Sequence, residues 1–80
     1  MQQIIIVIYE KNELAIQMSE VVNNGVLKIV ELNRSNKVIL EDHIGNTDFI
    51  RTQVELTSGK YKIQIISSAV MLTKKLTISR

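Results

Sequence analysis

The chain has 80 residues, enough for one domain with a modest apolar core. It contains no cysteine, which excludes disulfides and thiolate metal sites, and its net charge of +2 neither requires nor excludes an anionic partner. Apolar residues make up 45% of the sequence, a share typical of a folded globular domain rather than a disordered chain.

Apolar residues recur mostly with a period of two or in short runs, and turn residues separate these runs at spacings of roughly 8 to 12 residues. Such a pattern predicts an all-β fold with antiparallel strands, because one face of each strand is apolar and the other polar. We expect seven strands, over residues 3–10, 13–19, 25–32, 37–43, 48–56, 60–67 and 70–79.

The first two expected strands have different patterns. Ile4–Ile8 is β-branched throughout, which predicts a strand that is either buried on both faces or held between the two sheets. In the next strand Leu14, Ile16 and Met18 share one face and alternate with more polar residues. A helix over residues 13–22 is the alternative, because Leu14 and Met18 also lie at helical spacing.

Short polar segments rich in Asn, Ser and Gly predict the turns. They are Asn23-Asn24-Gly25, Asn33-Arg34-Ser35-Asn36, Ser58-Gly59 and Ser67-Ser68. Asn36 is expected to adopt the left-handed backbone conformation that asparagine tolerates. Ser58-Gly59 precedes the final hairpin, and Ser67-Ser68 connects its two strands.

The sixth expected strand alternates clearly, with Tyr61, Ile63 and Ile65 directed inward. The chain lacks proline, so edge strands must be protected from pairing by charged side chains. We assign that role to four lysines: Lys60, Lys62, Lys74 and Lys75. Together these features predict a single domain over residues 1–80, a seven-stranded antiparallel immunoglobulin-like β-sandwich. A closed barrel is the alternative.

Catalytic or metal-binding groups do not converge in the sequence. His43 is the sole histidine, and we expect it to be a hydrated residue at a strand end. Ser58 and Ser67 lack a nucleophile-elbow motif, so turn roles are expected for them. Asp42 and Asp48 flank a loop that lacks EF-hand spacing, which leaves only a loose surface calcium site as an alternative. We therefore expect no enzyme activity, no cofactor and no metal.

The four lysines of the last hairpin could form a small positive patch. Nucleic-acid binding on a sheet usually adds aromatic stacking platforms, but the chain offers only Tyr9, Phe49 and Tyr61. Hence we expect no nucleic-acid partner, and an anion-binding lysine face is the weaker alternative. No apolar run approaches the ~20 residues of a transmembrane helix. An exposed sheet edge would allow a homodimer through strand pairing.

The final hairpin, "LTSGKYKIQI" followed by "TKKLTISR", resembles the C-terminal sorting domain of the type IX (Por) secretion system of Bacteroidetes. That family typically ends in a leucine, a Ser-Gly pair, an aromatic two places after the glycine, and a terminal Lys-Lys strand. The matching positions are Leu56, Ser58, Gly59, Tyr61, Lys74, Lys75, Leu76 and Ile78. The family's opening Pro-Asn-Pro segment is absent, and the additional strand "QIIIVIYE" stands before the matching region.

The extra strand is more similar to a family of small secreted Bacteroidetes proteins of unknown function. Either resemblance implies a non-catalytic immunoglobulin-like module that is secreted, periplasmic or located at the cell surface. The sorting-domain resemblance implies a protein partner in a secretion or surface-anchoring machinery. The residues expected to serve its recognition are Gly59, Tyr61, Lys74, Lys75 and Leu76. The alternative is a stand-alone sandwich that binds a protein or a carbohydrate.

Overall fold

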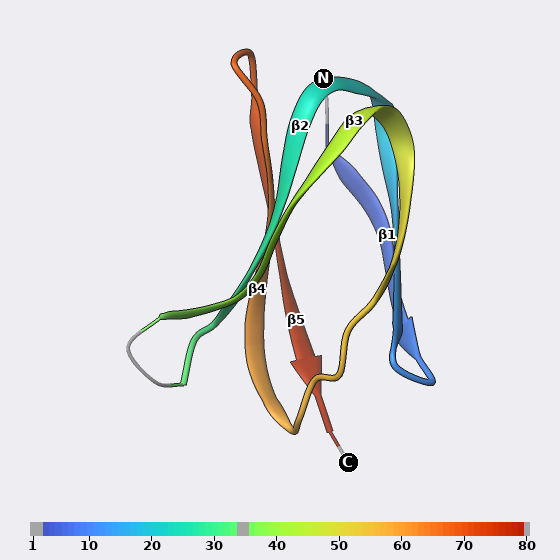
Figure 1. Ribbon diagram of the computed structural model, residues 1–80. Coiled ribbons are helices and arrows are strands. Elements are labelled where there is room, and N and C mark those ends of the chain that lie inside the picture. Colours follow the sequence, from blue (N-terminus) through green and yellow to red (C-terminus); the bar gives the residue numbers. More distant parts are fainter. Residues whose placement is uncertain (1–2, 34–35, 80) are drawn as a thin grey trace.

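The computed structural model describes residues 3–33 and 36–79 of the chain, and these form an antiparallel, all-β structure (Figure 1). The described residues contain five strands: β1 (Ile4–Glu10), β2 (Glu13–Glu31), β3 (Lys37–Gln53), β4 (Gly59–Ile66) and β5 (Met71–Ile78). Among them, no helix is present that could cross a membrane.

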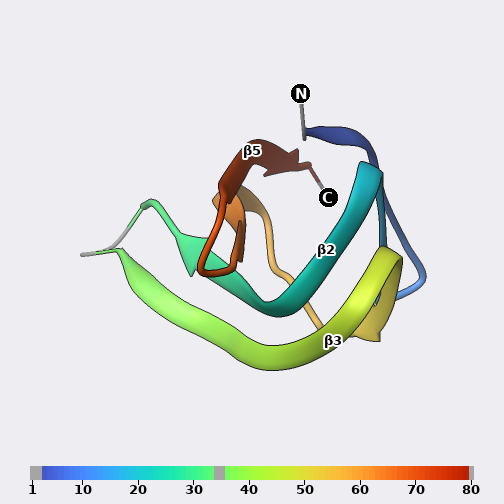
Figure 2. The same cartoon turned by 90° about the horizontal axis from the view of Figure 1, so that it is seen from above.

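The long strands β2 and β3 organise the fold. They pair with each other from Glu13 opposite Gln53 to Glu31 opposite Lys37, and both bend sharply midway (Figures 1 and 2). The first arm of β2 pairs with β1, and its second arm pairs with β4, which in turn pairs with β5. The sheet therefore curls over into a half-barrel, and we call its two sides layers (Figure 2). One layer holds β1, the first arm of β2 and the arm of β3 over residues 47–53, and the other has the order β3-β2-β4-β5, with β3 represented by residues 37–43.

The expected count of seven strands is wrong for the described residues, because two expected chain reversals are bends within continuous strands. Asn23-Asn24-Gly25 lies inside β2, and the segment between residues 43 and 48 lies inside β3. Asn24 has φ of 52° and Gly45 has φ of 64°. These left-handed residues produce irregularities in the register between Val22 and Val26, so both strands change direction while they stay paired.

The core lies between the two layers. Its fully buried side chains come mainly from β2 and β4: Leu14, Ile16, Met18, Val22, Leu27, Ile29, Tyr61, Ile63 and Ile65, together with Leu56 from the connection before β4. The inward faces expected for residues 13–19 and 60–67 are thus confirmed. The helical alternative for residues 13–22 is wrong, because this segment is extended and pairs with both β1 and β3.

β1 does not have the two buried faces expected from its sequence. Ile4 is buried, but Ile5, Ile6 and Ile8 are each about half exposed, at 48%, 50% and 53%. β1 is the last strand of its layer, and its one pairing partner within the described part of the chain is β2. Nothing among the described residues covers its outer face, and this explains the difference.

The turns of the β2–β3 and β4–β5 hairpins agree with the sequence where they are described. Asn36 has φ of 52°, as expected, while Arg34 and Ser35 lie outside the described residues. At the β4–β5 turn, the Ser67 amide donates to the Val70 carbonyl at 2.9 Å. The Ser67 hydroxyl accepts from the Ala69 and Val70 amides at 3.3 Å, which confirms its turn role.

The edge-protecting role expected for Lys60 and Lys62 is wrong. Both lie on β4, which pairs with β2 on one side and β5 on the other and is therefore an interior strand. Lys74 and Lys75 do lie on an edge, because β5 pairs only with β4 among the described residues. Whether a lysine-bearing strand lies at an edge depends on the order of the strands in the sheet, and local sequence patterns carry no information on that order.

Candidate interaction surface

The final hairpin pairs β4 with β5 in a regular register from Gly59 opposite Ile78 to Ile66 opposite Met71. Lys74 stands opposite the buried Ile63, so its side chain leaves from the face that looks toward the other layer. Lys75 stands opposite Lys62 on the outer face. Lys74 and Lys75 are both exposed. The Lys-Lys pair therefore presents one ammonium group on each side of an edge strand.

Tyr61 and Gly59 shape this hairpin from within. Tyr61 is 1% exposed, and its hydroxyl donates to the Thr57 carbonyl at 2.8 Å, which ties β4 to the connection that precedes it. Gly59 has φ of 153°, and a Cβ at this position would lie 2.5 Å from Nδ2 of Asn33. Leu76 is half-buried opposite Tyr61. Of the five sequence-derived candidates, only the two lysines are fully available to a partner.

The outer face of the hairpin carries an excess of positive charge. Lys62 and Lys75 are direct cross-strand partners, and Lys60 is one residue before the buried Tyr61 on β4. Within residues 3–33 and 36–79, the ion pair present joins Arg51 to Glu13 at 2.8 Å, in the other layer. Like charges directly opposite each other disfavour the ladder, so this face favours a neighbouring anionic group.

The opposite edge of the same layer is acidic, a feature that sequence reasoning missed. The second layer has the order β3-β2-β4-β5, so the arm of β3 over residues 37–43 and the strand β5 are its two edges. Glu41 and Asp42 are exposed on this arm of β3. Asp42 stands opposite the buried Leu27, and Glu41 stands opposite Lys28 on the outer face. The two adjacent acids that follow the apolar run of residues 38–40 were the available signal.

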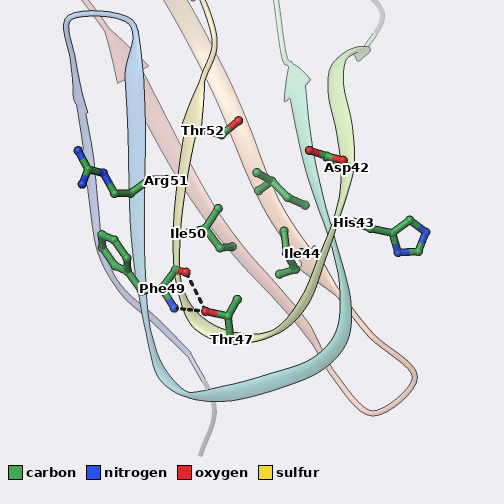
Figure 3. Close-up of a pocket in the computed structure, with 9 residues that line it drawn as sticks. Asp42, His43, Ile44, Thr47, Phe49, Ile50, Arg51 and Thr52 are labelled. Carbon is green, nitrogen blue, oxygen red and sulfur yellow. Dashed lines mark hydrogen bonds between the residues drawn. The ribbon is translucent and has the colours of Figure 1, made fainter.

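A shallow hollow of about 270 Å³ lies inside the bend of β3 (Figure 3). Ile44 and Ile50 point into it from the two arms of the strand, and the side chains of Asp42 and Thr52 project from opposite sides (Figure 3). The hollow thus has an apolar floor with a carboxylate and a hydroxyl at its rim. This composition suits a small ligand that carries both apolar and hydroxyl groups.

The residues examined for catalysis or metal binding do not converge. His43 lies within β3 rather than at a strand end, and its ring points away from the hollow (Figure 3). Asp42 faces inward. An oxygen of the Asp48 carboxylate instead accepts a hydrogen bond from the side-chain amide of Gln17 at 3.3 Å. Within the part of the chain that the structure describes, no three His, Cys, Asp or Glu side chains are grouped as a metal site would require.

An apolar patch covers the outer face of the other layer. Ile6 and Ile8 of β1 and Phe49 of β3 are each about half exposed. Gln17 of β2 pairs with both Ile6 and Phe49, so these residues form one cross-strand row. The ion pair between Glu13 and Arg51 lies in this same layer, apart from Lys74 and Lys75 of β5.

No protein-family model matches the chain, and no curated protein is significantly similar to it.

Proposed function

We propose that this chain is a non-catalytic, exported interaction module, and that its final hairpin is contacted by a secretion or surface-anchoring machinery. The observation that carries the proposal is the position of β5. It is the last strand of its layer, it leaves one row of backbone groups without a ladder partner among the described residues, and it exposes Lys74 and Lys75 on opposite faces.

We further propose that the architecture is an immunoglobulin-like sandwich in which β2 and β3 each contribute to both layers. If each bent strand is counted as its two arms, residues 3–33 and 36–79 form seven extended segments in two facing layers. The alternating burial of β2 and β4 supports this assignment, because the buried faces of both look into the space between the layers.

The mode of recognition that fits this edge is addition of a partner strand to β5. Backbone hydrogen bonds would supply most of the affinity, and side-chain contacts on both faces would supply specificity. Lys74 and Lys75 would pair with acidic residues of the added strand. Gly59, Tyr61 and Leu76 would act indirectly, since they fix the hairpin that presents the two lysines.

The proposal is tested with a reporter protein fused to the N-terminus of this chain in a bacterium that has a type IX secretion system. Removal of residues 70–80 is expected to abolish export of the reporter. The truncation also removes Leu72, a core residue that is 7% exposed. The folding of the truncated fusion must therefore be checked by circular dichroism. Normal export of a truncated fusion would contradict the proposal.

A second candidate function follows from the hollow inside the β3 bend. In this proposal the chain is a stand-alone small secreted protein that binds a carbohydrate, with Asp42 and Thr52 as hydrogen-bonding groups over Ile44 and Ile50. Titration calorimetry with a panel of oligosaccharides tests it. Heat of binding that is lost in Asp42→Asn would support this function, and the absence of heat across the panel would count against it.

A further inference from the structure

We propose that the chain associates head to tail with copies of itself, through β3 residues 37–43 of one copy and β5 of the next. The two strands are opposite edges of one layer, and they differ in charge. Glu41 and Asp42 place two adjacent carboxylates on the β3 edge, which carries one lysine, Lys37, at its start, whereas Lys74 and Lys75 place two ammonium groups on the β5 edge. This association does not rest on the secretion role proposed above.

The direction of the strands suits such a junction. β3 is antiparallel to β2, β2 to β4, and β4 to β5, so β5 runs opposite to β3 within the layer. If a second copy lies beside the first in the same orientation, its β5 therefore runs antiparallel to β3 of the first copy. The junction would extend the same antiparallel sheet from one molecule into the next.

A single register places both acids opposite both lysines. If Asp42 stands opposite Lys74 of the next copy, then Glu41 stands opposite Lys75, because the numbering runs in opposite directions on the two strands. The faces also agree. Asp42 and Lys74 belong to the inward face, since their partners Leu27 and Ile63 are buried. Glu41 and Lys75 belong to the outer face.

The apolar residues of the two edges match in this same register. Leu40 stands opposite Leu76, and Ile44 stands opposite Leu72. All four residues are half-buried or buried on the inward side of their own strands. Head-to-tail addition therefore continues the core from one copy into the next, with the charged pairs between the apolar ones.

The hydrogen-bonding phase of the ladder is consistent with this register. In an antiparallel sheet, residue pairs that exchange backbone hydrogen bonds (narrow pairs) alternate with pairs that do not (wide pairs). This alternation runs along each strand and also across a row of neighbouring strands. Asp42, Leu27, Ile65 and Leu72 form one such row across the four strands. The Asp42–Leu27 pair and the Ile65–Leu72 pair must therefore both be narrow or both be wide. Lys74 lies two residues after Leu72, so its pair with Ile63 is also of that type. Asp42 and Lys74 thus orient their backbone groups compatibly at the junction.

Glu41 and Asp42 cannot pair with Lys74 and Lys75 of the same copy. Three strand spacings separate β3 from β5, about 14 Å, which is well beyond the reach of an ion pair. A junction between two different edges is heterologous, so each added copy leaves one acidic and one basic edge free. We expect open-ended oligomers whose size grows with protein concentration and falls with salt.

Charge reversal at each edge provides the test. Sedimentation velocity of the wild-type protein at low salt is expected to show concentration-dependent oligomers. Glu41→Lys/Asp42→Lys and Lys74→Glu/Lys75→Glu should each lower the association constant by about tenfold or more, because like charges then meet at every junction. Lys11→Glu is the control for a change in net charge, since Lys11 lies in the turn between β1 and β2 and on neither of the two edges.

A mixture of the two edge variants gives the decisive result. The first variant has two basic edges and the second has two acidic edges, so neither should associate alone while their equimolar mixture should regain oligomers. Zero-length carbodiimide coupling should join Asp42 to Lys74 between differently isotope-labelled copies. Wild-type protein that remains monomeric at low salt, or a mixture of folded variants that remains monomeric, would overturn the proposal. Loss of association in the β3 variant with unchanged reporter export would separate this proposal from the secretion role.

Discussion

Gly25 and Gly45 stand opposite each other in the ladder where β2 and β3 bend together from one layer into the other. Their roles differ. Gly25 is buried, and a Cβ there would lie 2.9 Å from Cδ1 of Ile44 and 3.0 Å from Cγ1 of Val22. Gly45 has open space around it but a φ of 64°, a left-handed conformation. One glycine permits close packing, and the other permits the backbone bend.

Substitution of Gly25 should destabilise the fold through crowding. We expect Gly25→Ala to lower the free energy of unfolding by about 1 kcal/mol, and the larger Gly25→Val to lower it by about 3 kcal/mol. Urea denaturation measures both. In an Ile44→Ala background the cost of Gly25→Ala should fall, because the closest contact is removed. Equal costs in both backgrounds would contradict the steric explanation.

Gly45 should respond to backbone preference instead of size. Gly45→Ala is expected to cost about 1 to 2 kcal/mol, since a Cβ disfavours the left-handed region. Gly45→Asn should cost less, because asparagine adopts this conformation more readily. The same urea titration checks the order of the two variants, and an asparagine variant less stable than the alanine variant would argue against a left-handed bend.

The Tyr9 hydroxyl should be a measurable source of stability. It donates to the Val54 carbonyl at 2.8 Å and accepts from the Leu56 amide at 2.8 Å, which fastens β1 to the connection between the layers. Tyr9→Phe leaves both backbone groups without this partner, and we expect a loss of about 1 to 3 kcal/mol. Thermal and urea unfolding measure this loss. Equal free energies of unfolding for the variant and the wild type would show that these hydrogen bonds contribute nothing to stability.

Local periodicity predicted the strands and their faces well, but not the way the strands connect. Alternation over residues 13–19 and 60–67 identified the buried side chains, because a strand's two faces depend only on neighbouring residues. Asn23-Asn24-Gly25 was interpreted as a chain reversal, although Asn24 forms a bend within β2. Left-handed residues serve hairpin turns and bulges alike, and the ladder partner decides between them.

Exposure and edge position depended on strand order, which the sequence pattern does not contain. The run of isoleucines in β1 suggested burial on both faces, yet Ile6 and Ile8 lie on an uncovered face. Lys60 and Lys62 suggested an edge, yet β4 is interior. For the candidate surface, the sequence indicated the exposed lysines of the last strand, whereas the acidic edge on β3 became visible only with the topology.

Reversal of one charge in the hairpin should stabilise it. Lys62 is opposite Lys75, so Lys62→Glu replaces a repulsive cross-strand pair with an attractive one. We expect a gain of about 0.2 to 1 kcal/mol at low salt. The gain should shrink as salt screens the pair. Lys60→Glu, opposite Thr77, is the control for the change in net charge. Equal stabilities of the two variants would show that the opposed lysines do not interact.

The exposed isoleucines of β1 should promote aggregation and contribute little to folding. Ile8 is 53% exposed and pairs with Ala15 on the outer face. We expect Ile8→Lys to change the free energy of unfolding by less than about 0.5 kcal/mol. The same substitution should delay aggregation on heating, because a lysine interrupts an uncharged, β-branched segment near a sheet edge. Light scattering during a thermal ramp measures this, and an unchanged onset would exclude β1 as the aggregating segment.

The most direct test of the central claim is export of the reporter fusion when β5 is kept but its charges are reversed. The fraction of reporter in the medium is measured for the wild type, Lys74→Glu/Lys75→Glu and the control Lys11→Glu, which lies in the turn between β1 and β2. If the edge strand is what the machinery contacts, export falls sharply for the first variant and stays near wild type for the second. Equal export of all three folded fusions would contradict the claim that Lys74 and Lys75 present the recognised edge.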